Sequence, residues 1–488
     1  MVKDSLKVLS GTFIANACGI IRLYIISKAL TPERYGIWNL LMLIPAYVLI
    51  LDFGVLTGMD KTVPTFRGQS RNEEIEAVKS TTFTALFILA VLFSIILFLI
   101  SFVGNNIFES MTIIGLRLLS IVVFCSVLQN FYLTVLRAEK EFGLISKANS
   151  AFAISSVLYL ILLYSTPFNK FYTTIISIIF AYVTSLLICI FFSAYKFMWM
   201  LDYKILKKLI KIGLPLVFTG INFLLLTSID RWIIAKYLSK VELGNYALGA
   251  TFASLLFMLS SVFGYVIYPR ILEKYGQCSD EKKLESYILR ATMVLTSIVG
   301  IACCMIVQLL PFIYDTFFPL YKGGQFAASF IITGMFFLSI TTIMGNYLIA
   351  VNKQSRIILF QIIFIASGIV GYYFVTSLIG NIQSVAIVTA ILFFLYGSTI
   401  VIYSLITLGC PYNKIIKTLF EFISTIVIGF ISIFLFKFAN KLIFNFSDSH
   451  ESLIGALILM VIYILYFVAS DKRRLIFIDL KKSFLSGT

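Results

Sequence analysis

The chain has 488 residues, of which 60% are hydrophobic and only 13% are charged, and its net charge is +16. Its mean hydropathy of +0.99 excludes a water-soluble domain. Apolar runs of about 20 residues recur along the whole length, and each is long enough to cross a hydrocarbon core of about 30 Å. The composition therefore predicts an all-α, polytopic membrane protein.

The apolar runs predict about fourteen transmembrane helices. The expected spans are 6–29, 37–58, 80–103, 112–136, 148–165, 173–195, 212–230, 244–268, 287–311, 327–350, 357–377, 385–408, 419–438 and 453–469. With the N-terminus inside, 26 of the 39 Lys and Arg residues fall in inward-facing segments, or 28 if Lys7 and Arg290, in the first turns of their spans at the inner side, are counted with them. This bias predicts that both termini are cytoplasmic. The positive charge thus reflects topology and does not indicate a nucleic-acid partner.

The first predicted helix carries a face of small residues that leads to a cation. The small residues recur at spacings of three and four: Gly11, Ala15, Cys18 and Gly19. Arg22 follows them about 9 Å inside the far interface, at about 1.5 Å per residue. An arginine at that depth costs at least ~2.5 kcal/mol unless it snorkels or faces water. Arg22 is therefore a candidate cavity residue, and snorkelling to the interface is the alternative.

Two segments around outward turns resemble each other. Residues 24–40 and 232–248 align at an offset of 208 with six identities, including Lys28 with Lys236. Six spans lie within this offset, and an even number gives both copies the same orientation. The sequence therefore predicts a parallel repeat about an axis along the membrane normal. The two lysines mark the repeated turn and are candidates for gating or coupling.

The repeat predicts how the chain is divided. We expect a six-helix lobe at 1–195, a cytoplasmic linker at 196–211, a second six-helix lobe at 212–408, and two additional helices with a cytoplasmic tail at 409–488. The linker is basic and amphipathic, with lysines at helical spacing, which suits the anionic head groups of the inner leaflet. The two lobes are expected to face each other across a central space.

The seventh predicted span ends at a charged pair, Asp230 and Arg231, and the face that precedes it includes Asn222. This face is more polar than a lipid-facing surface should be. The repeat aligns Asp230 with Arg22, so the two charges could face each other across the central space. A local interfacial cap formed by the Asp230–Arg231 pair explains the pattern equally well.

Three further polar residues lie at membrane depth. Arg117, early in the fourth span, either lines the cavity or anchors the helix at the interface. Asp52, near the inner end of the second span, is expected to be hydrogen-bonded to a neighbouring helix and is a further gating or coupling candidate. Asn16 is most simply an interhelical hydrogen-bonding residue, and it also lies on the path to Arg22.

The sequence lacks the short motifs of metal-binding proteins, ATP-driven pumps and serine hydrolases. The seven cysteines form no C-x-x-C pair, so neither a disulfide framework nor a metal site is predicted. The sequence contains neither G-x-x-x-x-G-K-[ST] nor G-x-S-x-G. This chain alone is therefore not expected to be an ATP-driven pump, and no catalytic residue is predicted.

Five short segments occur in an order that is typical of one family. They are Leu30-Thr-Pro-Glu-Arg-Tyr-Gly36, Asp52-Phe-Gly54, Asp230-Arg231, Gly244-Asn-Tyr246 and Val351-Asn-Lys-Gln-Ser-Arg356. With the predicted topology, the chain resembles the bacterial polysaccharide, or O-antigen repeat-unit, flippases of Wzx type. These belong to the multidrug/oligosaccharidyl-lipid/polysaccharide (MOP) exporter superfamily. The resemblance covers essentially the whole chain.

The resemblance implies a flippase in the bacterial cytoplasmic (inner) membrane. Its expected substrate is an undecaprenyl-pyrophosphate-linked oligosaccharide repeat unit, moved by alternating access for O-antigen or capsule synthesis. No cofactor is expected, and a coupling ion, either proton or sodium, is left open. Membrane lipids, a polysaccharide polymerase and a chain-length regulator are candidate partners. Arg22 would suit the pyrophosphate, because the planar guanidinium matches phosphate oxygens.

Two rival functions are compatible with a chain this hydrophobic. An ion-coupled multidrug antiporter of the same fold would need carboxylates to hold cationic drugs, and the intramembrane charges here are not predominantly acidic. A membrane-embedded glycan polymerase or ligase would usually carry a large outward loop, and the predicted outward loops are short. Both alternatives are therefore less favoured than the flippase.

Overall fold

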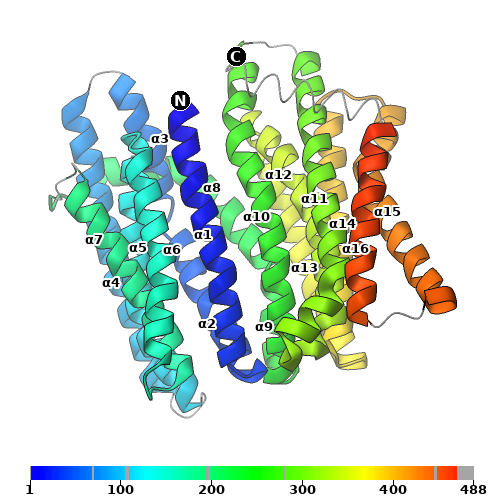
Figure 1. Cartoon of the computed structure of the whole chain (residues 1–488). Helices are drawn as coiled ribbons and strands as arrows, with labels where there is room; N and C mark the ends of the chain where they lie inside the picture. The colour runs from blue at the N-terminus through cyan, green and yellow to red at the C-terminus, as the bar shows by residue number, and fades with distance from the viewer. Residues whose placement is uncertain are drawn as a thin grey trace. The chain divides into compact units, whose positions relative to one another are not determined.

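The computed structural model describes residues 2–68, 71–104, 109–193, 195, 198–277, 281–444 and 448–469. Within these ranges every regular element is helical, which confirms the all-α class. The helices, in chain order, are α1 (Val2–Ala29), α2 (Pro32–Ile50), α3 (Val55–Gly68), α4 (Asn72–Val103), α5 (Ser110–Ala138), α6 (Phe142–Tyr164), α7 (Lys170–Phe192), α8 (Tyr203–Leu226), α9 (Ile229–Tyr237), α10 (Lys240–Gln277), α11 (Glu281–Phe317), η2 (Pro319–Gly324), α12 (Gln325–Ala350), α13 (Gln354–Leu378), α14 (Ile382–Thr407), α15 (Tyr412–Ala439), η3 (Asn440–Phe444) and α16 (Asp448–Ala469) (Figure 1).

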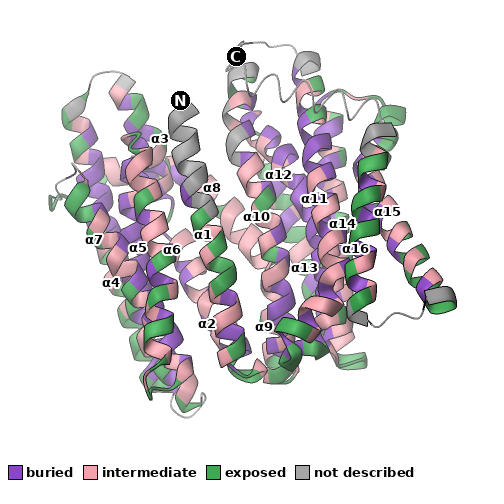
Figure 2. Ribbon diagram, in the orientation of Figure 1, coloured by how far each residue is buried: buried purple, intermediate pink, exposed green. Residues whose placement is uncertain are grey.

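Many of these helices are long and apolar enough to cross a bilayer. In the described part of the chain there are 11 such helices, or 12 if the bent pair α2 and α3 forms one span. Large apolar side chains are exposed along the outer faces of several helices, for example Leu99 on α4 and Phe374 on α13 (Figure 2). Such surfaces suit contact with lipid. The protein is therefore a multi-pass membrane protein, and the total of fourteen spans stays a prediction.

Contacts within the chain divide it into two units, Met1–Leu225 and Leu226–Thr488. In the first unit α5 is central and packs against α2, α3, α4 and α7, while α6 packs against α1 and α7. In the second unit α12 is central and packs against α10, α11 and α14, while α13 packs against α9 and α14. Both central helices bury much of their length, because they are surrounded by neighbours.

The same order of neighbours recurs in the two units. If α2 with α3, and α8 with α9, each count as one predicted span, the first span packs on the fifth and the fifth on the sixth. The second, third and sixth spans all pack on the fourth. This order is the one that a repeat of six helices would give; the repeat, its axis and the membrane orientation stay predictions. The additional helices α15 and α16 pack against α11, within the second unit.

The second predicted span, 37–58, is not one continuous helix. The chain bends by 44° between α2 and α3, and Phe53 and Gly54 at the break have positive φ angles of 53° and 83°. The carboxylate of Asp52 accepts hydrogen bonds from the backbone N–H groups of Gly54, at 2.9 Å, and Leu56, at 2.8 Å. Asp52 therefore caps the start of α3 and does not bond to a neighbouring helix, because the break leaves free N–H groups beside it.

The linker and the seventh span also differ from the expected boundaries. Helix α8 begins at Tyr203 and runs without interruption through Pro215 to Leu226, so the second half of the predicted linker continues directly into the span. The seventh span then stops before Asp230, which lies in the first turn of a separate short helix, α9. The second span is thus interrupted at residues 51–54, and the seventh span, which the predicted repeat aligns with α1, is interrupted near its end.

A cluster of ion pairs joins α3, α4 and the end of α5. Glu139 accepts hydrogen bonds from Arg67, at 2.6 Å, and from Lys79, which also pairs with Glu76 at 2.8 Å. Burial alone would raise the pKa of Glu139, but Lys79 and Arg67 outweigh it and hold that pKa below its ordinary value. The Lys79 side chain is only 5% exposed, so it depends on these two carboxylates for compensation of its charge.

Replacing Glu139 with glutamine should lower thermal stability at pH 7, because Lys79 and Arg67 lose a charged partner. A carboxylate with a depressed pKa stabilises the fold above its unfolded pKa, and this stabilisation is lost as the pH falls through the folded pKa. The difference between the wild type and Glu139→Gln should therefore be full at pH 7 and shrink below about pH 4.5. Heating followed by size-exclusion chromatography in detergent measures it. A difference that does not vary with pH would contradict this assignment.

Candidate functional site

Arg22 lies about two turns before the end of α1 and has aromatic residues of the first unit around it. Its guanidinium carbon is 5.9 Å from the centroid of the Trp38 ring on α2. The groups that interact with it electrostatically are the hydroxyls of Tyr182, Tyr164 and Tyr35, from α7, α6 and α2. No acidic side chain is among these groups. The surroundings of Arg22 are thus polar enough to orient a cation and do not neutralise it.

The guanidinium of Arg22 has no hydrogen bond or ion pair to any residue in the part of the chain that the structure describes. Its Nε is buried and lacks an acceptor. Arg117, which the sequence also predicts to lie at membrane depth, donates to the Ser101 hydroxyl at 3.2 Å and stacks on the Phe102 ring at 4.7 Å, at the end of α4. An unpaired donor in an apolar medium is costly. Arg22 is therefore the residue whose arrangement calls for an anionic ligand.

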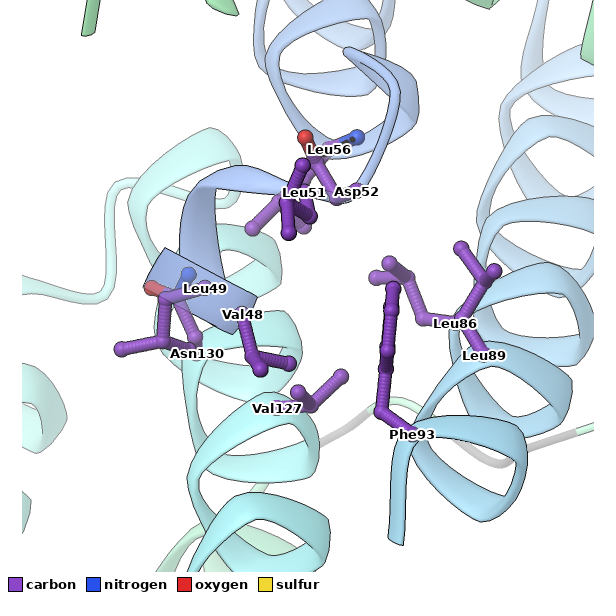
Figure 3. A pocket seen from close by; sticks show the side chains of 10 residues that line it. All are labelled: Val48, Leu49, Leu51, Asp52, Leu56, Leu86, Leu89, Phe93, Val127 and Asn130. Carbon is purple, nitrogen blue, oxygen red and sulfur yellow. Dashed lines mark hydrogen bonds between the residues drawn. The ribbon is translucent and has the colours of Figure 1, made fainter. Parts of the chain in front are cut away.

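The break between α2 and α3 borders a small apolar recess of the first unit (Figure 3). Leu86, Leu89 and Phe93 of α4 form one side of it, and residues of α2, α5 and the break form the other. Asp52 is only 7% exposed, and both of its oxygens are engaged by backbone N–H groups. Asp52 therefore serves the local structure of the break, and its gating role stays a prediction.

A buried hydrogen-bond network surrounds Asp230 in the second unit. Tyr246 on α10 donates its hydroxyl to the Asp230 carboxylate at 2.6 Å, and the same hydroxyl lies 3.0 Å from that of Thr389 on α14. Thr389 also bonds to Tyr372 on α13, at 2.9 Å. Asp230 is 3% exposed. A chain of hydrogen bonds that ends at the Asp230 carboxylate thus joins four helices, which makes this network more extensive than a local cap.

Arg231 faces back toward the end of α8. Its backbone N–H donates to Asp230 at 2.8 Å, its guanidinium donates to the Thr227 carbonyl at 2.9 Å, and its Nε lies 3.8 Å from the Asp230 carboxylate. The capping alternative therefore describes part of the arrangement. Arg22 and Asp230 belong to different units, so their approach across a central space stays a prediction.

The remaining predicted residues make few side-chain contacts. Lys28 is exposed, bonds to the Tyr24 hydroxyl at 3.2 Å and lies over that ring, and Lys236 likewise lies 5.1 Å from the Tyr237 ring. Asn16 and Asn222 are half-buried on α1 and α8. None of these four is brought next to Arg22 by a contact that the structure shows, and their binding and gating roles stay predictions.

The aromatic residues around Arg22 and the partners of Asp230 were missed by the sequence analysis. Trp38 stands two residues after Gly36 in the repeated turn segment, and Tyr35 precedes it by one helical turn. That spacing placed both on one face of α2. With 26 Tyr residues in the chain, however, nothing in the sequence distinguished Tyr164 and Tyr182 from residues that only fill the helix bundle.

The chain is similar to known proteins along most of its length. A family described as "Polysaccharide biosynthesis protein" matches residues 25–314. A Shigella flexneri protein named as an O-antigen transporter is 21% identical over 284 residues, which cover 56% of this chain and 66% of that protein, just under two thirds of its length.

Two solved structures share the fold. One, described as the lipid II flippase MurJ in an inward closed conformation, has a TM-score of 0.71 and 14% identity and covers 94% of this chain and 98% of its own. The other, an inward-facing multidrug resistance MATE transporter of the MOP superfamily, has a TM-score of 0.70 and 14% identity and covers 85% and 99%. At this identity the likeness concerns the fold.

Proposed function

Because this chain belongs to the polysaccharide biosynthesis protein family, we propose that it is a flippase for undecaprenyl-pyrophosphate-linked oligosaccharide repeat units. The observation that carries the proposal is the guanidinium of Arg22, which has a buried Nε without an acceptor and no acidic residue among the groups it interacts with. The pyrophosphate is the negatively charged part of such a substrate. Water solvates this charge outside the membrane, and fixed cations must replace the water when the charge enters an apolar medium.

Different parts of the substrate would contact different surroundings. The lipid tail remains in the bilayer, and only the head group has to enter the protein. The aromatic rings around Arg22 provide flat apolar surfaces of the kind that pack against sugar rings, while the guanidinium binds phosphate oxygens. Alternating access would expose this site to one side of the bacterial cytoplasmic membrane at a time.

The proposal extends to the surroundings of the protein. A proton or sodium ion would couple transport, and a polysaccharide polymerase and a chain-length regulator would act on the translocated product. O-antigen and capsule are both compatible destinations for the repeat unit. The sequence similarity to a protein named as an O-antigen transporter supports the first of these.

The proposal is tested with the purified protein in proteoliposomes that contain a fluorescent lipid-linked oligosaccharide. We expect a glycosidase added outside to cleave a larger fraction of the oligosaccharide when the protein is present, because molecules from the inner leaflet become accessible. Release of polymerised glycan instead would favour the polymerase. Transport of cationic drugs without movement of the oligosaccharide would favour the multidrug antiporter and overturn the proposal.

Asp230→Asn is expected to change the rate of transport while leaving the protein inserted and abundant. The substitution keeps the size of the side chain but removes the charge that faces Tyr246 and Arg231. If the network differs between the two access states, a change of about 1.4 kcal/mol alters their ratio tenfold. Labelling of cysteines placed at Gly220 and Asn222 from the outer face measures that ratio.

Tyr246→Phe is the matched control for this experiment, because it removes one hydrogen bond to Asp230 and retains both charges. We expect a smaller change in labelling and in transport than Asp230→Asn gives. Unchanged labelling together with unchanged transport in Asp230→Asn would leave the Asp230–Arg231 pair as a structural cap at the start of α9.

A further inference from the structure

Trp38, next to Arg22, also has a buried hydrogen-bond donor without an acceptor. The indole Nε1 of Trp38 is buried and has no hydrogen-bond acceptor, and neither has the Nε of Arg22. The two side chains are direct neighbours, since the guanidinium carbon lies 5.9 Å from the Trp38 ring centroid. Two adjacent buried donors without acceptors are unfavourable at membrane depth. A ligand that offers several oxygen acceptors would satisfy both.

The orientation of Trp38 is held by its own helix. Tyr35, one turn earlier, is fully buried, and its ring centroid lies 5.5 Å from that of Trp38 at an angle of 40°. Trp38 itself is only partly buried. An indole that is supported on one face and has a free N–H is preorganised, so that binding costs little additional rotamer entropy. This arrangement differs from an indole that only fills space.

We propose that Trp38 donates its indole N–H to the same phosphate group that Arg22 binds. A phosphate oxygen accepts a hydrogen bond at a donor–acceptor distance of about 2.9 Å. Because one phosphate group carries several oxygens, one oxygen can accept from Arg22 while another accepts from Trp38. Trp38 is thus a substrate-binding residue, and its N–H selects a ligand with clustered oxygen acceptors over a simple cation or an apolar molecule. This inference rests on the proposed function and assigns it a second binding residue.

The indole N–H can be separated from the indole face by substitution. Trp38→Phe keeps an aromatic ring beside Arg22 and Tyr35 but has no donor. We expect the concentration of inorganic pyrophosphate that gives half-maximal thermal stabilisation of the purified chain to rise about tenfold in Trp38→Phe, the equivalent of about 1.4 kcal/mol. Trp232→Phe, an equal change on α9, is the matched control and should leave this concentration unchanged.

A second measurement does not require any substitution at Trp38. The chain has three tryptophans, Trp38, Trp199 and Trp232, so the double variant Trp199→Phe/Trp232→Phe reports on Trp38 alone. Its emission should shift when pyrophosphate is added, and Arg22→Ala in the same background should abolish the shift. This readout keeps the inference testable if Trp38→Phe fails to give a monodisperse protein.

The outcomes separate the inference from the proposed function. Equal pyrophosphate responses in the wild type and Trp38→Phe, with the response lost in Arg22→Ala, would overturn the role of Trp38 and leave Arg22 as the phosphate-binding residue. If the wild type responds neither to inorganic pyrophosphate nor to undecaprenyl pyrophosphate in vesicles, the phosphate site of the proposed function is itself overturned. A shift that undecaprenyl phosphate produces as strongly would assign the site to a single phosphate.

Discussion

Arg22→Ala is expected to abolish translocation of the lipid-linked oligosaccharide at normal expression levels. Removing one partner of a buried, hydrogen-bonded charge pair costs about 2–5 kcal/mol, which corresponds to tens-fold to thousands-fold weaker binding. In the proposed complex that partner is the pyrophosphate. The lost binding free energy would slow each step in which the head group moves from water into the protein. The measurement is glycosidase accessibility in proteoliposomes with equal amounts of protein.

The thermal stability of Arg22→Ala should not fall together with its activity. In the described residues the guanidinium makes no hydrogen bond or ion pair, and its buried Nε is unsatisfied. Removing it therefore deletes a desolvation cost as well as a weak contact with the Trp38 ring. We expect unchanged or slightly raised stability. An inactive and strongly destabilised variant would instead mean that Arg22 supports the fold.

Two further variants complete this comparison. Arg22→Lys should recover translocation only in part, because an ammonium group cannot form the paired hydrogen bonds of a guanidinium. Arg117→Ala is the matched control, since Arg117 already has Ser101 and Phe102 as partners and should lose little activity. Full activity of Arg22→Ala would return Arg22 to the snorkelling alternative and remove the main support for the flippase site.

The helices of this protein could be predicted because their cause is local. A run of about 20 apolar residues must satisfy its backbone within itself when lipid surrounds it, and a helix does so. The interruptions could not be placed in the same way. The apolar sequence continues up to Leu51, and only the combination of the Asp52 carboxylate with the positive φ of Phe53 and Gly54 makes a break there stable.

The candidate site was only partly predictable. Arg22 was identified because a charge at membrane depth is costly wherever it points. Its neighbours depend on how α1, α2, α6 and α7 pack together, and no periodicity of the sequence records those contacts. The network around Asp230 has the same origin, since Thr389 lies 159 residues further along the chain. A single sequence identifies the charged residue at membrane depth, whereas the groups that surround it can be identified only from the packing of the helices.

The contact between the helix break and α8 leads to the second large expected effect. Gly54 and Gly213 approach through their backbones. A Cβ on Gly213 would lie 1.9 Å from the carbonyl oxygen of Gly54, and a Cβ on Gly54 would lie 2.4 Å from the carbonyl carbon of Gly213. The Gly54 carbonyl also accepts the Gly58 N–H at 2.8 Å, which fixes it in α3. No side chain can rotate away to make room.

Gly213→Ala should therefore destabilise the first unit, because α8 must move away from the break to accommodate one methyl group. Overpacking typically costs about 1–3 kcal/mol, and a clash between two backbones belongs at the upper end. Gly220→Ala is the matched control on the same helix, since its Cβ would meet only the Ile50 side chain at 3.5 Å, an ordinary contact. The fraction of protein that stays monodisperse after heating in detergent measures both variants.

Gly54→Ala tests the same contact from the other side. It combines the clash with Gly213 and a φ of 83° that an L-residue adopts only with strain, so it should lose at least as much stability as Gly213→Ala. Through this contact the break between α2 and α3 packs directly on α8. Variants that weaken it should alter transport more than equal destabilisation elsewhere. If Gly213→Ala is as stable and as active as Gly220→Ala, the break and α8 do not pack in this way in the membrane.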